Sequence, residues 1–156
     1  MGVAGSGKTT VGSLLARELH WEFADGDDFH SPANIAKMRA GIPLTDADRA
    51  PWLETLRGLA AGWIAKAENA VLACSALKQS YRDILQIGEQ VRFVYLQGDR
   101  NVFSQRLLER HDHYMKAQML DSQLRTLEPP LNAIVVDANA SPENIVREIR
   151  RKLDLT

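Results

Sequence analysis

The residues next to the N-terminus carry the pattern that most constrains this chain. Residues 2–9 read G-V-A-G-S-G-K-T, which fits the motif G-x-x-x-x-G-K-[ST]. Such motifs form loops whose backbone N–H groups surround a phosphate at the start of a helix. The loop normally joins a buried strand to that helix, yet only Met1 precedes it here. The motif predicts a nucleotide-binding loop and leaves open where its strand lies.

The pattern also assigns roles within the loop. Lys8 is expected to reach the β- and γ-phosphates, and the Thr9 hydroxyl is expected to bind Mg²⁺. The remaining residues expected to hold the phosphates are Gly2, Val3, Ala4, Gly5, Ser6 and Gly7. The alternative is a glycine-rich helix cap that resembles the motif by chance.

Composition narrows the class of protein. A chain of 156 residues is long enough for one domain with a substantial core. The net charge of −1 offers no basic field for nucleic acid, and no apolar run reaches the ~18 residues of a membrane span. The single cysteine, Cys74, fits a reducing compartment. We therefore expect a cytoplasmic protein that binds neither nucleic acid nor membrane.

Apolar periodicity predicts strands that alternate with helices. Helices are expected over 8–20, 32–40, 101–110 and 116–124, from about residue 51 onward, in the segment that carries Tyr81, Ile84 and Leu85, and from residue 142 onward. Strands are expected over 21–24, 71–74, 91–96 and 133–136. This order predicts an α/β fold, a three-layer arrangement with a parallel sheet covered on both faces.

The absence of a strand before the phosphate loop bears on the stability of the predicted sheet. In phosphate-loop kinases the strand before the loop lies in the middle of the sheet. Without it, two neighbouring strands lose their ladder partner, at ~1–3 kcal/mol for each buried unpaired group. We expect that the natural protein starts upstream of Met1 with a short aliphatic strand. The alternative is a damaged fragment.

Two carboxylates follow the strand expected at 21–24. Asp25 and Asp27 should face the phosphate loop, because ligands bind at the carboxyl ends of parallel strands. One would accept the proton of an acceptor hydroxyl and the other would hold Mg²⁺. The alternative is a solvated acidic turn. The later apolar strand has no metal-binding Asp at its end, which favours a small-molecule kinase over a GTPase or motor ATPase.

Several cations are candidates for binding anions. Lys37, Arg49, Lys78 and Arg82 are placed to grip an anionic acceptor, although each is also typical of an exposed helix charge. Arg106 and Arg110 lie one turn apart and are candidates for the transferring phosphate, while Arg110 also suits a helix C-terminus. His111 and His113 give a weak metal signal. Cys74, Trp52 and Trp63 are expected in the core.

Three blocks in order resemble the gluconate kinase family, within the shikimate-kinase-like phosphate-loop kinases. The first is DGDDFHSPANIAKMRAGIPLTDADRAPWL over 25–53, the second is ACSALKQSYRDIL over 73–85, and the third is QMLDSQLRTLEPP over 118–130. Together with the phosphate loop, the resemblance covers essentially the whole chain.

The resemblance implies ATP-dependent phosphorylation of D-gluconate at its 6-hydroxyl. It implies one domain over 1–156, a five-stranded parallel sheet whose first central strand is absent from this chain, a helical lid at about 111–126 and a homodimer. Asp27 would contact the acceptor and act as base, and Asp25 would assist Mg²⁺. His30, Lys37, Arg49, Lys78 and Arg82 would bind gluconate.

The chain departs from the family in its lid. The family usually has R-x-x-H-F, often with Gly before the His, whereas this chain has R-H-D-H-Y over 110–114. Asp112 therefore replaces the usual Gly. Two other readings stay open: a kinase for another small hydroxy acid such as shikimate, and a truncated, non-catalytic nucleotide-binding remnant.

Overall fold

The computed structural model describes residues 1–110 and 113–155, and gives 113–117 as helix without describing their side chains. The helices are α1 (Lys8–Leu19), α2 (Pro32–Arg39), α3 (Asp46–Ala65), α4 (Gln79–Leu85), α5 (Arg100–Leu108), α6 (His113–Thr126) and α7 (Pro142–Lys152), with a 3-10 turn, η1 (Gly26–Phe29). The strands are β1 (Glu22–Asp25), β2 (Ala70–Ala73), β3 (Val94–Gln97) and β4 (Ile134–Asp137). The predicted alternation of strands and helices is confirmed.

Helix α3 starts earlier than the apolar pattern predicts. It begins at Asp46, ahead of Pro51, so the predicted start was wrong. The reason is a capping box: the Asp48 N–H donates to the Thr45 hydroxyl (3.1 Å), and the Thr45 N–H donates to the Asp48 carboxylate (2.9 Å). Pro51 lacks an N–H and removes one helical hydrogen bond, a loss that the cap offsets.

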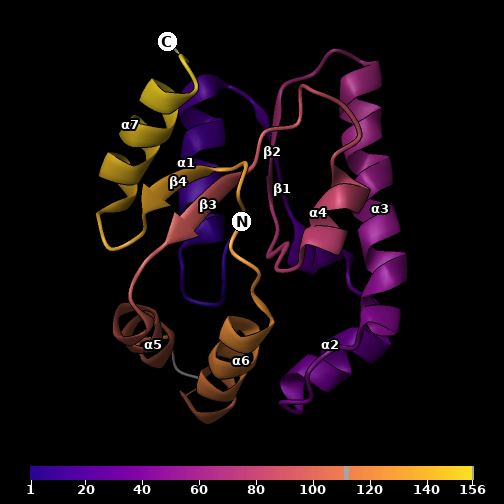
Figure 1. Ribbon diagram of the computed structural model, residues 1–156, viewed down its shortest axis with the longest axis vertical. Coiled ribbons are helices and arrows are strands. Elements are labelled where there is room, and N and C mark those ends of the chain that lie inside the picture. The colour runs from indigo at the N-terminus through magenta and orange to yellow at the C-terminus, as the bar shows by residue number, and fades with distance from the viewer. Residues whose placement is uncertain (111–112, 156) are drawn as a thin grey trace.

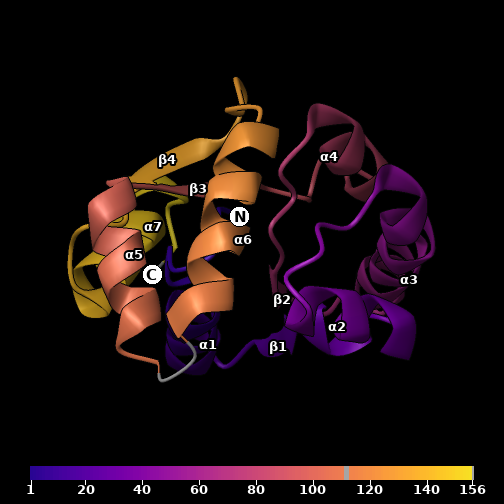
Figure 2. The same cartoon turned by 90° about the horizontal axis from the view of Figure 1, so that it is seen from below.

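The strands form two parallel pairs. β1 pairs with β2, with Asp25 opposite Ala73, and β3 pairs with β4, with Gln97 opposite Asp137. The carboxyl ends of β1 and β3 lead into η1 and α5, at the end of the molecule where α2, α5 and α6 lie (Figures 1 and 2). The residues that follow the strands therefore gather at this end.

The first two residues bridge the two pairs of strands. The Leu96 N–H donates to the Met1 carbonyl (3.0 Å), and the Gly2 N–H donates to the Ser75 carbonyl (3.3 Å). The Met1 amino group donates to the Val94 carbonyl, and burial lowers the pKa of that amine to about 5. Met1 and Gly2 thus join β3 to the segment that follows β2 through backbone hydrogen bonds.

A cavity of about 880 Å³ continues behind Met1. Consecutive residues 70–74, which include β2, line one side, and 91–94 with Leu96, which include two residues of β3, line another. The expectation that two neighbouring strands lack a full ladder partner is confirmed. The sheet of this chain is two strand pairs joined at one end.

Helices cover the strands on several sides. α1 and α7 pack together, and α3 packs on α4 beside the β1–β2 pair (Figure 1). Buried side chains shared among these layers include Leu15, Leu53, Leu56, Val136 and Ile145. This core fixes the strand ends that carry the site.

Candidate active site

The phosphate loop enters α1 with the backbone that its glycines permit. Gly5 (φ 78°) and Gly7 (φ 94°) adopt left-handed conformations. A Cβ at Gly5 would lie 2.6 Å from the Phe103 carbonyl of α5, so only glycine lets α5 approach this closely. Because the loop ends on a helix N-terminus, its N–H groups and the helix dipole both favour a phosphate.

Lys8 lies inside this loop. Its Nζ donates to the Val3 carbonyl at 3.0 Å. Burial lowers the pKa of Lys8, while the facing charges of Asp27 and Asp25 oppose that shift. A lysine poised between a phosphate loop and two carboxylates suits the binding of a transferring phosphoryl group.

Thr9 and the two carboxylates form one hydrogen-bonded unit. The Thr9 Oγ1 donates to Asp25 Oδ2 at 2.5 Å, and the Asp27 N–H donates to Asp25 Oδ1 at 3.0 Å. Hydroxyl and carboxylate oxygens are ligands that Mg²⁺ takes alongside waters and substrate phosphates. The residues present therefore fit a magnesium–nucleotide complex, in which Thr9 and Asp25 would be the protein ligands.

Asp27, the predicted base, lies in η1 directly after β1. It is exposed along one side, yet partial burial of its carboxyl group raises its pKa, and the facing Lys8 opposes this rise. Asp25 and Asp28 raise the pKa further by like-charge repulsion. The structure thus sets a carboxylate with enhanced basicity next to the phosphate loop.

Trp52 of α3 anchors the acidic turn. Its Nε1 donates to the Gly26 carbonyl at 2.7 Å, and its ring stacks on His30 with centroids 4.3 Å apart. A Cβ at Gly26 would lie 3.0 Å from the Ala73 carbonyl, so β2 confines the turn from another side. Trp52 was expected in the core, with the border of a pocket as the alternative, and it is buried. The structure makes it a support for the turn that holds Asp25 and Asp27.

His30 lies beside the base rather than in open solvent. It is buried, and its Nδ1 is 3.4 Å from the amide nitrogen of Asn34. Burial lowers the pKa of His30, Asp27 opposes the shift, and Arg49 adds to it. His30 therefore feels the charges of both Asp27 and Arg49 of α3.

Arg49, Lys78 and Tyr81 form what we call the cationic cluster. The Arg49 Nη1 donates to the Leu44 carbonyl (2.6 Å) and to the Tyr81 hydroxyl (3.3 Å). The Arg49 guanidinium and the Lys78 ammonium lie 5.5 and 5.7 Å from the centroid of the Tyr81 ring. Two of the predicted acceptor cations thus converge on one aromatic ring. Tyr81 was not predicted as a site residue, although it stands in the same sequence block as Lys78.

Two other predicted acceptor cations are engaged in structural contacts. The Lys37 Nζ donates to both oxygens of Asp48, at 2.8 and 2.9 Å. Arg82 is 3% exposed, and its guanidinium donates to the carbonyls of Ala76, Leu77 and Glu128. In this structure Lys37 steadies the start of α3, and Arg82 clamps the loop that carries Lys78.

The predicted phosphate arginines lie on and after α5. Arg110 follows α5, and its charge adds to the burial that lowers the pKa of Lys8. Arg106 is half-buried in the last turn of α5. His111 and Asp112 lie outside the described residues, and so do the side chains of His113 and Tyr114. Within the described part of the chain, no group of three or more His, Cys, Asp or Glu residues is arranged to hold a metal ion.

Helix α6 reaches the phosphate loop through Gln123. The Ala4 N–H donates to Gln123 Oε1 at 2.7 Å. Beyond the helix, the Glu128 N–H donates to the Leu77 carbonyl (2.8 Å), and the Glu128 carboxylate accepts from the Gln79 N–H (2.7 Å). Sequence reasoning missed Gln123, although the block that carries the resemblance contains it. One segment therefore touches both the phosphate loop and the loop that holds Lys78.

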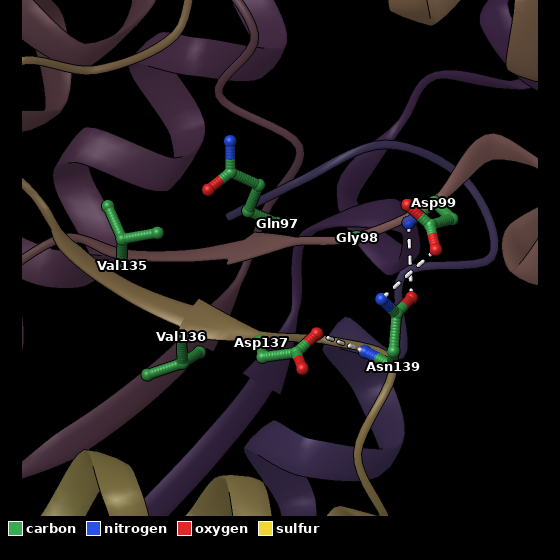
Figure 3. Close-up of a pocket in the computed structure, with 7 residues that line it drawn as sticks. All are labelled: Gln97, Gly98, Asp99, Val135, Val136, Asp137 and Asn139. Carbon is green, nitrogen blue, oxygen red and sulfur yellow. Dashed lines mark hydrogen bonds between the residues drawn. The ribbon is translucent and has the colours of Figure 1, made fainter.

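A separate hollow of about 430 Å³ lies at the carboxyl ends of β3 and β4 (Figure 3). The Asp99 N–H donates to Asn139 Oδ1 (3.1 Å), and the Asn139 N–H donates to Asp137 Oδ1 (2.9 Å). None of the predicted site residues lines this hollow. We place the chemistry at the phosphate loop, where the reactive groups converge.

Comparisons with known proteins agree with this geometry. The family described as Shikimate kinase matches residues 4–154. The gluconokinase of Gluconobacter oxydans is 43% identical over 155 residues, which cover 97% of this chain and 87% of that protein. The thermoresistant gluconokinase of Escherichia coli is 43% identical over 151 residues, which cover 94% of this chain and 86% of that protein.

Solved structures give the same result. The crystal structure of a gluconokinase from Sinorhizobium meliloti superposes with a TM-score of 0.87 at 42% identity, over 99% of this chain and 89% of that one. Shikimate kinase from Aquifex aeolicus shares the fold, with a TM-score of 0.60 at 22% identity, over 99% of this chain and 93% of that one. No helix of the described residues is both long and apolar enough to cross a membrane. The chain is a phosphotransferase that belongs to the gluconokinase family, within the shikimate-kinase group of phosphate-loop kinases.

Proposed function

We propose that this enzyme transfers the γ-phosphoryl group of ATP to the 6-hydroxyl of D-gluconate, giving ADP, 6-phospho-D-gluconate and a proton. The observation that carries the proposal is the unit of Thr9, Asp25 and Asp27 beside Lys8. It joins a phosphate-binding loop, a pair of magnesium ligands and a base in one place. The cationic cluster of Arg49 and Lys78 around Tyr81 supplies the charge that a sugar acid requires.

Each residue has a role in this scheme. Loop residues 2–9 hold the nucleotide phosphates, through amides other than those of Gly2, Ala4 and Ser6, which donate within the protein. Lys8, Arg106 and Arg110 balance negative charge that builds up on the transferring group. Asp27 accepts the proton of the 6-hydroxyl as that oxygen bonds to phosphorus and the bond to the ADP oxygen breaks. Thr9 and Asp25 hold the Mg²⁺ that neutralises phosphate charge. Most of the rate comes from positioning and electrostatics.

The acceptor is held between the cationic cluster and Asp27. Arg49 and Lys78 bind the gluconate carboxylate, and His30 lines the path to the base. Lys37 and Arg82 support the acceptor site through the contacts described above. We further propose that the region 111–126 acts as a lid, that the enzyme is a cytoplasmic homodimer, and that it serves gluconate utilisation.

The test is ADP release measured with D-gluconate, with shikimate and without acceptor. We expect release that depends on gluconate and falls by about 10²- to 10³-fold in Lys8→Ala, the loss typical for one electrostatic stabiliser. Release that depends on shikimate would identify the other hydroxy acid as the acceptor. A folded protein silent with both acceptors would support the non-catalytic alternative.

A further inference from the structure

Asp46 holds the cations that an acceptor carboxylate needs. The Lys78 Nζ donates to both Asp46 oxygens, at 3.0 and 3.1 Å, and the Tyr81 hydroxyl donates to Asp46 Oδ1. Arg49 shares the same Tyr81 hydroxyl. We propose that Asp46 is a specificity residue that occupies the cationic cluster as a substitute carboxylate until the carboxylate of the acceptor displaces it. This inference rests on the proposed function.

A comparison with Asp48 shows why Asp46 is displaceable. Asp48 accepts from the Thr45 N–H and from Lys37, so it closes the start of α3. Among the described residues, the Asp46 carboxylate accepts no hydrogen bond from a backbone N–H, and its side chain is 65% exposed. Its described hydrogen bonds run to the side chains of Lys78 and Tyr81.

Release of Asp46 from the cluster costs α3 little stability. Asp46 stands in the first turn of α3, where the helix dipole favours a carboxylate in any rotamer. If it turns into solvent, it keeps that interaction and regains water. The cluster then presents an ammonium, a phenol hydroxyl and a guanidinium to a new carboxylate, whose pairing with them is charge-assisted.

The cluster also lies where an acceptor must pass. Trp52 stands three residues after Arg49 on α3, stacks on His30 and donates to the Gly26 carbonyl next to Asp27, so the same stretch of α3 carries the cluster's arginine and contacts the turn that holds Asp27. An acceptor with a carboxylate at one end and a hydroxyl at the other would span this interval. In the absence of an acceptor, Asp46 neutralises the cluster and disfavours the binding of unrelated anions.

The test compares wild type with Asp46→Asn, and uses Glu54→Gln as a control that removes an exposed charge from the same helix. We expect the KM for gluconate to fall by about three- to tenfold in Asp46→Asn, the range that one displaced hydrogen bond is worth, with little change in kcat. Acetate should raise the Tm of Asp46→Asn at lower concentration than it raises that of wild type. Glu54→Gln should behave as wild type in both assays.

A second variant separates this role from a structural one. In a Lys78→Met background the Asp46→Asn change should no longer alter the KM, because its target cation is gone. An unchanged or raised KM in the single variant would overturn the inference and make Asp46 an orienting partner of Lys78. The acetate assay needs no turnover, so it tests the cluster even if gluconate fails as the acceptor.

Discussion

At the scale of single residues, the site depends on the opposition between Lys8 and Asp27. Partial burial disfavours the charge on each of them, and each favours the charge on the other. The result is a base with a raised pKa beside a cation that binds phosphate. A base is most effective when its pKa approaches the working pH, so partial burial of Asp27 favours catalysis.

The raised pKa of Asp27 predicts a pH dependence. The base must be ionised to accept a proton, so kcat/KM should fall as the pH drops through the pKa of Asp27. Because burial raises that pKa, this decline should begin above the ~3.9 of a free aspartate. Asp27→Asn should lose about 10²- to 10⁴-fold in kcat. Its pH–rate profile should not show this decline at low pH.

The measurement is a pH–rate profile of wild type, Asp27→Asn and Asp28→Asn. Asp28 is the exposed neighbour of Asp27 in η1. The Asp28→Asn enzyme should therefore keep the decline at low pH and most of the rate. An Asp27→Asn enzyme with normal turnover and weaker ATP binding alone would show that Asp27 is not the base.

At the scale of elements, the C-terminal part of α6 and the segment after it support two loops of the site. The helix contacts the phosphate loop through Gln123, and the segment after it contacts the Lys78 loop through Glu128. A part-buried loop N–H that does not donate to a phosphate still needs another hydrogen-bond acceptor. Gln123 supplies that acceptor for the Ala4 N–H.

Gln123→Met should therefore disturb the phosphate loop. Methionine is similar in length but leaves the Ala4 N–H unpaired, at about 1–3 kcal/mol. We expect kcat/KM for ATP to fall by about tenfold or more, with a smaller change in the KM for gluconate. Steady-state kinetics against Gln118→Met, a change at an exposed position of the same helix, checks this. Equal ATP kinetics in the two variants would show that the contact is dispensable.

These elements also show how far sequence reasoning extends. The phosphate loop, Asp25 and Asp27 are contiguous motifs whose spacing has a direct chemical meaning, so their convergence could be predicted. The supports could not be predicted in this way. Trp52 and Gln123 bind backbone groups of Gly26 and Ala4, which lie far away in the sequence, and no local pattern encodes such pairs. The start of α3 was missed because Pro51 gives a stronger signal than the capping box.

At the scale of the whole molecule, backbone hydrogen bonds of Met1 and Gly2 join the two strand pairs. Residues of β2 and of β3 line the cavity behind them, so a parallel strand placed there would lie next to both. The buried Met1 amine, with its pKa lowered to about 5, lies at the mouth of this cavity. Any residues joined to that nitrogen would enter the cavity as an extended strand.

An engineered extension tests this feature. Four β-branched residues added before Met1 should fill the cavity and restore ladder hydrogen bonds, each worth about 0.5–1.5 kcal/mol. At about 2–4 °C per kcal/mol for a domain of this size, we expect the Tm to rise by at least about 5 °C. A Gly-Ser extension of equal length is the control. Equal Tm values for the two extended proteins would contradict strand insertion.

The central claim is that one site holds an acceptor with its carboxylate at the cationic cluster and its far hydroxyl at Asp27. The most direct measurement is the position of the phosphate on the product, read by ³¹P and ¹³C NMR after reaction with ATP and D-gluconate. The account predicts a single phosphomonoester at C6. A phosphate on an inner hydroxyl or an acyl phosphate at C1 would contradict the placement of the acceptor, and ADP formed without a phosphorylated sugar acid would contradict the proposed reaction.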